Sequence, residues 1–118
     1  MPTPEELRQR TKAFALRVIR LYRALPSSAE AQVIGKELLR CGTSVAANYR
    51  AVCRARSRAE FVSRLGIVVE EADESMLWLE LLDESGVVKH ESLDALHREA
   101  KELTALFTAS RNTTRSRP

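Results

Sequence analysis

The sequence predicts an all-α protein, an up-down antiparallel four-helix bundle in one domain. Four segments carry apolar residues at intervals of three and four, which is the period of an amphipathic helix. Glycine and proline number four each in 118 residues, and aromatic residues make up 5%, a composition that favours helices over strands. A chain of this length buries one core but not two. We therefore assign residues 1–110 to the bundle, and residues 111–118, which lack apolar side chains and contain three arginines, to a disordered basic tail.

The first predicted helix runs from about Pro4 to Leu25. Thr3 and Glu6 form a capping box around a proline at the first helical position. Pro26 follows the helix and cannot continue it. The apolar stripe that faces the core consists of Leu7, Phe14, Val18, Leu21 and Leu25.

The second predicted helix runs from about Ser28 to Arg54 and has two adjacent apolar seams. Gly35 and Gly42 lie in one seam, and each costs roughly 1 kcal/mol relative to alanine inside a helix. They indicate either the close approach of a neighbouring helix or a local bend, and we favour close packing. Asn48 lies in the other seam, where we expect its amide to bond across the bundle and fix the helix register.

The two cysteines are predicted to be reduced. Cys41 and Cys53 are twelve residues apart in one helix, roughly 18 Å along its axis, which is too far for a disulfide. Free thiols are typical of a cytoplasmic protein. The first twenty residues carry too many charges for a signal peptide, and no uncharged apolar run is long enough to span a membrane.

The third predicted helix starts with a capping box of Ser57 and Glu60 and ends near Glu84, before Gly86. It is apolar over more than one face, which on a bundle this small indicates a partner subunit. The fourth helix is expected to start after Ser92. Its apolar positions, at intervals of three and four, are Leu93, Leu96, Ala100, Leu103 and Phe107.

The formal net charge of +3 conceals a strong asymmetry along the chain. Residues 1–64 contain 13 Lys and Arg against 5 Asp and Glu, whereas residues 65–118 contain 6 against 11. Clustered arginines suit nucleic-acid phosphates, because neutralised phosphates release counterions and the guanidinium fork matches phosphate oxygens. The alternative is a solvated basic face that pairs with the acids of the third helix. The candidate nucleic-acid-binding residues are Arg17, Arg20, Arg50, Arg54, Arg56 and Arg58.

The sequence shows no arrangement typical of catalysis or of cofactor or metal binding. Di-iron bundles use inward carboxylates and a Glu-x-x-His motif on each of two helices, whereas the comparable spacing here is the single pair Asp94 and His97. Zinc-ligand spacing, a Ser-His-Asp order and a glycine-rich phosphate loop are also missing from the sequence. We therefore expect no enzymatic activity, no cofactor and no metal.

The segment from Leu38 to Leu82 resembles the four-helix-bundle family encoded in intervening sequences of bacterial 23S ribosomal RNA genes. The matching motifs are SVAAN at residues 44–48, AEF at 59–61, EADE at 71–74 and WLELL at 78–82. The similarity extends over about residues 10–108. Where the family usually has a glutamate after Asn-Tyr-Arg, this chain has Ala51.

This resemblance implies a homopentamer with a basic surface and no catalysis. A related branch of the family serves as the accessory protein of diversity-generating retroelements, which implies nucleic acid and a reverse transcriptase-like protein as partners. Two functions follow from residues and resemblance together. The leading one is a non-enzymatic homo-oligomer that binds the backbone of RNA or DNA through its arginines. The alternative is an interaction scaffold or adapter for another protein, whose basic surface serves solubility only.

Overall fold

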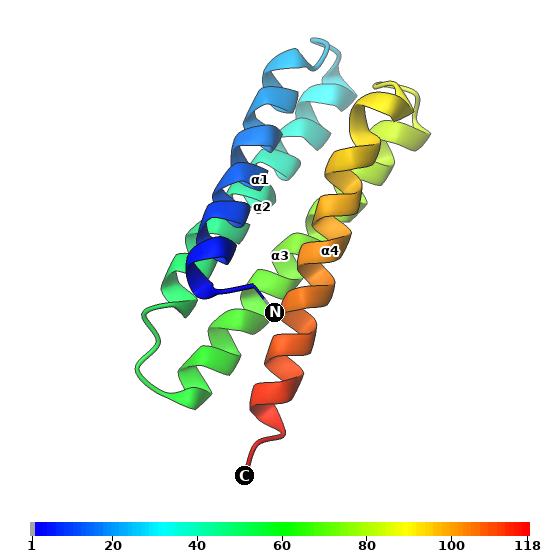
Figure 1. Ribbon diagram of the computed structural model, residues 1–118. Coiled ribbons are helices and arrows are strands. Elements are labelled where there is room, and N and C mark those ends of the chain that lie inside the picture. The colour runs from blue at the N-terminus through cyan, green and yellow to red at the C-terminus, as the bar shows by residue number, and fades with distance from the viewer. Residues whose placement is uncertain (1) are drawn as a thin grey trace.

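Four helices make up the computed structural model, which describes residues 2–118. They are α1 (Pro4–Ala24), α2 (Ala29–Val52), α3 (Arg58–Glu84) and α4 (His90–Arg115). Successive helices run in opposite directions and form an elongated bundle of about 50 × 21 × 19 Å (Figure 1). The predicted all-α four-helix bundle is confirmed.

Two helix starts agree with the local signals in the sequence. The Thr3 hydroxyl accepts a hydrogen bond from the Glu6 backbone N–H at 3.1 Å, and the Ser57 hydroxyl accepts one from the Glu60 N–H at 3.0 Å. Each bond satisfies a backbone donor that the first helical turn leaves without a partner. Gly86, with φ of 78°, follows α3 in the left-handed region that glycine adopts without strain.

The structure corrects both ends of the fourth helix. It begins at His90 rather than after Ser92, and it continues to Arg115, so that residues 111–115 of the expected disordered tail are helical. No glycine or proline interrupts the chain between Gly86 and Pro118, and the backbone ladder can therefore continue without an apolar stripe. The Thr114 hydroxyl also donates to the Ser110 carbonyl oxygen at 2.9 Å.

One continuous core runs through the bundle. Its ring contact joins Tyr49 of α2 to Phe107 of α4, with 5.1 Å between the ring centroids. Two polar residues are fully buried, and their hydroxyls donate to carbonyl oxygens one turn earlier, Thr11 to Leu7 and Ser75 to Glu71. The largest fully buried side chains are Phe14, Phe107, Leu38, Leu65, Leu79, Leu82, Leu93, Leu103, Val18, Val45, Val52 and Val68.

The glycines of α2 mark its close contact with α1. A Cβ atom at Gly42 would lie 2.8 Å from a Val18 methyl carbon, and one at Gly35 would meet the side chains of Leu25 and Tyr22. The expectation of close packing is therefore confirmed. This contact also sets the register of the α1–α2 pair, which decides which charged residues face each other further along the two helices.

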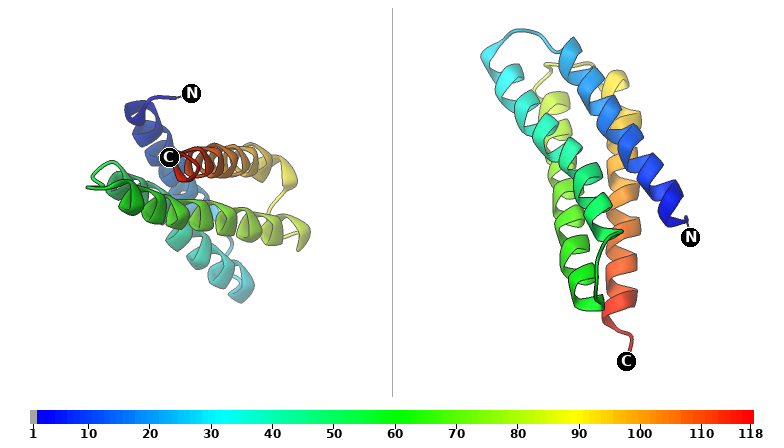
Figure 2. Two further views of the ribbon diagram at one scale, coloured as in Figure 1. Left: turned by 90° about the horizontal axis from the view of Figure 1, so that it is seen from below. Right: turned by 90° about the vertical axis from the view of Figure 1, so that its left-hand side faces the viewer.

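The four helices are not packed equally. Helix α3 packs extensively on both α2 and α4, whereas α1 packs mainly on α2 and meets α4 over a shorter contact. Arg10 holds that contact, donating from Nε and Nη2 to the two carboxylate oxygens of Glu99 at 2.8 Å each. Towards the N-terminus α1 diverges from α2 (Figure 2). None of the helices in the described part of the chain combines the length and hydropathy needed to cross a bilayer.

Candidate nucleic-acid interface

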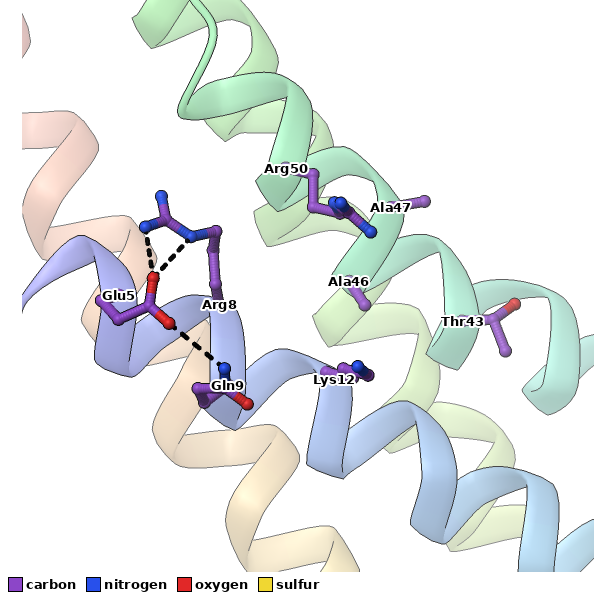
Figure 3. Close-up of a pocket in the computed structure, with 8 residues that line it drawn as sticks. All are labelled: Glu5, Arg8, Gln9, Lys12, Thr43, Ala46, Ala47 and Arg50. Carbon is purple, nitrogen blue, oxygen red and sulfur yellow. Dashed lines mark hydrogen bonds and ion pairs between the residues drawn. The ribbon is translucent and has the colours of Figure 1, made fainter.

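Two grooves flank the C-terminal half of α2. The first, here called the α1–α2 groove, has a volume of about 470 Å³ (Figure 3). The second, called the α2–α3 groove, has a volume of about 490 Å³. They share Ala47 and Arg50, so they adjoin across α2. The α1–α2 groove is lined by Glu5, Arg8, Gln9, Lys12, Thr43, Ala46, Ala47 and Arg50. The α2–α3 groove is lined by Ala47, Arg50, Ala51, Arg54, Arg56, Glu60 and Arg64.

Both grooves are basic, because six of the lining side chains are cationic and two are carboxylates. Each carboxylate is already matched by an arginine of its own helix. Arg8 donates to Glu5, from Nε at 3.2 Å, and Arg64 donates from Nε to Glu60 at 2.9 Å. The hydrogen bond from Arg8 lowers the pKa of Glu5 below its ordinary value. The two acids therefore leave the other cations of the grooves uncompensated.

Four cations of the grooves have no ion pair of their own. Among the ion pairs formed by residues 2–118, none involves Lys12, Arg50, Arg54 or Arg56. The acids of α3 that face α2 are instead taken by Arg40, which pairs with Glu71 and Glu74. Among residues 2–118, Arg50, Arg54 and Arg56 therefore form no ion pair with α3, and they are exposed to solvent. The alternative of a solvated basic face thus keeps its solvated part and loses the pairing of these three arginines.

Alanines are among the lining residues of both grooves. Ala46 and Ala47 of α2 line the α1–α2 groove, and Ala47 and Ala51 line the α2–α3 groove. Ala51 brings no charge into this cluster, where it lines the groove together with Arg50 and Arg54. A methyl group there leaves Arg50 and Arg54 free to reach an external anion.

The structure brings together only part of the predicted site. Arg50, Arg54 and Arg56 line the α2–α3 groove. Arg17 and Arg20 lie further along α1, towards its connection to α2, and line neither groove.

Arg58 lies at the lower end of the bundle, outside both grooves. Its guanidinium donates from Nη1 to the backbone carbonyl oxygens of Arg117 and Pro118, at 3.1 and 3.0 Å. It therefore ties the start of α3 to the end of the described chain. The same end of the bundle carries Arg115, which lines a shallow hollow beside Arg58.

Three further cations of the grooves, Arg8, Lys12 and Arg64, were not among the predicted site residues. The register of the α1–α2 pair is the signal that could have found two of them. Because Gly42 packs under Val18, the part of α2 two turns later, around Arg50, must face the part of α1 two turns before Val18. Antiparallel packing therefore places Arg8 and Lys12 opposite Arg50, as Figure 3 shows.

Asn48 differs from the prediction. Its side chain is half-buried, and its Nδ2 donates to the Ser44 carbonyl oxygen at 2.9 Å, one turn earlier in the same helix. The expected bond across the bundle is thus corrected to a bond within α2. The core positions of this part of α2 are Val45, Tyr49 and Val52, which turn Asn48 to the edge of the core, where a short amide can satisfy its donor locally.

The histidines lie at the opposite end of the bundle, between α3 and α4. His90 Nδ1 lies 2.8 Å from Asp83 Oδ2, and His97 Nε2 lies 2.8 Å from Glu80 Oε2. Asp94 pairs with Arg98 at 3.2 Å. Over residues 2–118, no group of three or more His, Cys, Asp and Glu side chains is arranged to hold a metal ion.

Known proteins resemble the chain in sequence and in structure. No curated protein matches it at a significant level. A crystal structure from Bacteroides thetaiotaomicron, of a protein of unknown function from the S23 ribosomal protein family, superposes with a TM-score of 0.83 and 32% identity over 89% of this chain and 97% of that one. The family model described as 23S rRNA-intervening sequence protein matches residues 5–109. The chain therefore belongs to the family of 23S rRNA-intervening sequence proteins.

Proposed function

We propose that this protein is a non-enzymatic, homo-oligomeric bundle that binds the backbone of RNA or DNA through its two basic grooves. The observation that carries the proposal is a set of four groove cations that form no ion pair with any other residue of the range 2–118. These are Lys12, Arg50, Arg54 and Arg56. Cations of this kind release bound counterions when they neutralise phosphates, and arginine adds two parallel hydrogen bonds to phosphate oxygens. Contacts to the backbone carry no sequence information, so binding is expected to be independent of sequence.

The test compares two triple variants that lower the net charge equally. Arg50→Gln, Arg54→Gln and Arg56→Gln remove the groove arginines. Lys36→Gln, Lys89→Gln and Lys101→Gln, taken together as the control, remove exposed cations that lie outside both grooves. Binding of a DNA duplex and of a structured RNA is measured by fluorescence anisotropy between about 50 and 200 mM salt.

The groove variant is expected to lose affinity and to reduce the slope of log K against log salt by about 2 to 3, because each lost phosphate contact removes about 0.9 from the slope. The control is expected to bind nearly as the wild type does. A wild type that binds neither probe at about 50 mM salt, or two triple variants that lose affinity equally, would contradict a role for the grooves. A third variant, Arg17→Gln with Arg20→Gln, measures the contribution of the arginines that the structure places apart.

The homo-oligomeric part of the proposal rests on an apolar face of α3. Ile67, Leu77 and Leu81 are 42%, 47% and 39% exposed, and their spacing places them within one sector of the helix, next to Glu70. On α1, Leu16 is 41% exposed. Around the helix axis its direction falls between those of Arg20 and Arg23.

We propose that the acidic, apolar face of α3 in one copy packs on the basic face of α1 in the next. Two different faces give a head-to-tail contact, which closes into a ring when the rotation from one copy to the next divides a full turn. The family resemblance implies five members.

The second candidate function is a scaffold for another protein, including a reverse transcriptase-like partner of the kind the resemblance implies. The same α3 face favours it, because exposed apolar side chains at helical spacing suit a protein surface. A partner that stays bound to the affinity-purified protein after nuclease treatment, and is lost in Leu77→Lys with Leu81→Lys, supports this function. Loss of all partners with nuclease speaks against it.

A further inference from the structure

We infer that the two grooves take double-stranded rather than single-stranded nucleic acid. The inference rests on the proposed function and deepens it by naming the form of the ligand. It comes from what the grooves lack as well as from what they contain: cations without counter-ions line both, and no aromatic side chain lines either.

The aromatic residues of this chain are all engaged elsewhere. Phe14, Tyr49 and Phe107 are buried in the core. Phe61 and Trp78 are partly buried and pack against it, and the Trp78 Nε1 donates to Glu74 at 3.0 Å. Tyr22 lies near the α1–α2 connection, where its hydroxyl donates to Gln32 at 3.3 Å. Since these six are all the aromatic residues of the sequence, the grooves offer no ring on which a base could stack.

A missing stacking platform counts against single strands in particular. Proteins that bind single strands without sequence preference combine a basic groove with aromatic side chains, and each stacked base contributes about tenfold in affinity. The neutral side chains of these grooves are one amide, one hydroxyl and methyl groups, from Gln9, Thr43, Ala46, Ala47 and Ala51. A single strand held here by its phosphates would leave its bases in water.

A duplex can bind without aromatic side chains in the grooves. Its bases are already stacked on one another, and it presents one charge per about 1.7 Å of axis on a stiff frame. Each neutralised phosphate also releases more counterion from a duplex than from a single strand, about 0.9 against 0.7. Grooves that work through charge alone therefore favour the duplex.

The placement of the cations agrees with a ligand that has two backbones. The grooves lie on opposite flanks of α2, with Arg8 and Lys12 on the α1 side and Arg56 and Arg64 on the α3 side. Arg50 lies between them and lines both. Along α2 the lining positions extend from Thr43 to Ala51, about 12 Å, and Arg54 and Arg56 follow in the connection to α3. The cations therefore form a broad surface rather than a single narrow channel.

The test measures the full-length protein against probes with equal numbers of phosphates at about 50 mM salt. The probes are a DNA duplex of about 20 base pairs, an RNA duplex of the same length, and an unstructured single strand of about 40 nucleotides. We expect at least one duplex to bind about tenfold or more tightly than the single strand, and with the steeper salt dependence. The two duplex probes distinguish DNA from RNA as the source of the phosphates.

A gain-of-function variant makes the test independent of any loss of folding. Ala47→Trp places an exposed ring between the two grooves, and it is expected to raise affinity for the single strand about fivefold or more while leaving duplex binding unimproved. A wild type that binds the single strand as tightly as the duplexes overturns the inference but leaves the proposed function standing. A wild type that binds none of the probes overturns the proposed function itself.

Discussion

Gly42 is the position where the packing of α1 on α2 depends on a single missing side chain. A Cβ atom there would lie 2.8 to 3.2 Å from three carbons of the buried, β-branched Val18 side chain, which has little freedom to move. At Gly35 the conflict is with the far end of Leu25 and with the Tyr22 ring, both half-buried. Replacement of each glycine by alanine is therefore expected to change the free energy of unfolding by a different amount.

We expect Gly42→Ala to lower the free energy of unfolding by about 1–2 kcal/mol, since overpacking a core costs about 1–3 kcal/mol and alanine recovers up to about 1 kcal/mol of helix propensity. Gly35→Ala is expected to stay within about 1 kcal/mol of the wild type, because Leu25 can rotate away. Urea denaturation of both variants measures the difference. Equal effects at the two sites would show that Val18 is not the constraint.

The two thiols are expected to differ sharply in reactivity. Cys41 is buried, its Sγ lies 3.2 Å from the Ser75 Oγ, and burial raises its pKa to about 11. Cys53 is exposed at the end of α2. Because the thiolate is the reactive form, a disulfide reagent at pH 8 is expected to titrate one thiol per native chain and two in denaturant. In the Cys53→Ser variant, the number of thiols titrated per native chain should fall to zero. Two thiols that react alike in the native protein would contradict the buried position of Cys41.

At the scale of the elements, the α3–α4 connection is held by a titratable contact. The hydrogen bond to Asp83 raises the pKa of His90 above its ordinary value of 6.5, and Asp94 and Glu91 act in the same direction. Because the folded state binds this proton more tightly than the unfolded chain does, the stabilisation is fully present below about pH 6.5. It is lost as the pH rises through the higher folded value.

His90→Gln is therefore expected to lower Tm at pH 5.5 and to have almost no effect at pH 8.5. Lys89→Gln, at the neighbouring exposed position, should shift Tm equally at both pH values. Thermal unfolding followed by circular dichroism gives the four comparisons. A loss at His90 that is the same at both pH values would mean that packing rather than charge holds the connection.

The end of a helix can be predicted from the sequence when the residues that stop or start the helix are its close neighbours in the chain. Thr3 and Ser57 could be identified as caps because the hydroxyl and the backbone N–H that it accepts from lie within four residues of each other. The start of α4 has no such signal, since its N-cap is Lys89 and no side chain caps the turn. Its end carries no apolar pattern either, and the helix continues because nothing breaks it.

At the scale of the whole molecule, the candidate site could be predicted only where its residues are neighbours in sequence. Arg50, Arg54 and Arg56 lie within seven residues and stay together in the fold. Arg8 and Lys12 join them through the register of α1 on α2, which depends on tertiary packing around Gly42. Asn48 shows the converse, since its place in an apolar seam did not reveal that the amide could be satisfied within its own helix.

The exposed face of α3 leads to the prediction on assembly. A monomer with Ile67, Leu77 and Leu81 open to water on one side of a helix gains by covering them, at about 25 cal/mol per Å² of apolar surface. We expect light scattering after size exclusion to give a mass well above the 13.3 kDa of one chain. Leu77→Lys with Leu81→Lys is expected to give a folded monomer.

The Leu16→Lys variant distinguishes a head-to-tail contact between copies from a symmetric one. In a head-to-tail contact between α3 and the basic face of α1, this change places a further cation beside Arg20 and Arg23 and removes the apolar contact, so the assembly is expected to dissociate. In a symmetric contact of α3 with itself, Leu16→Lys leaves the assembly intact. Val33→Lys, at a position that is 64% exposed on α2 and outside both faces, is the control and should keep the wild-type mass. A wild type of 13.3 kDa would remove the case for a ring, and the grooves of a single bundle would then have to hold the nucleic acid without repetition around an axis.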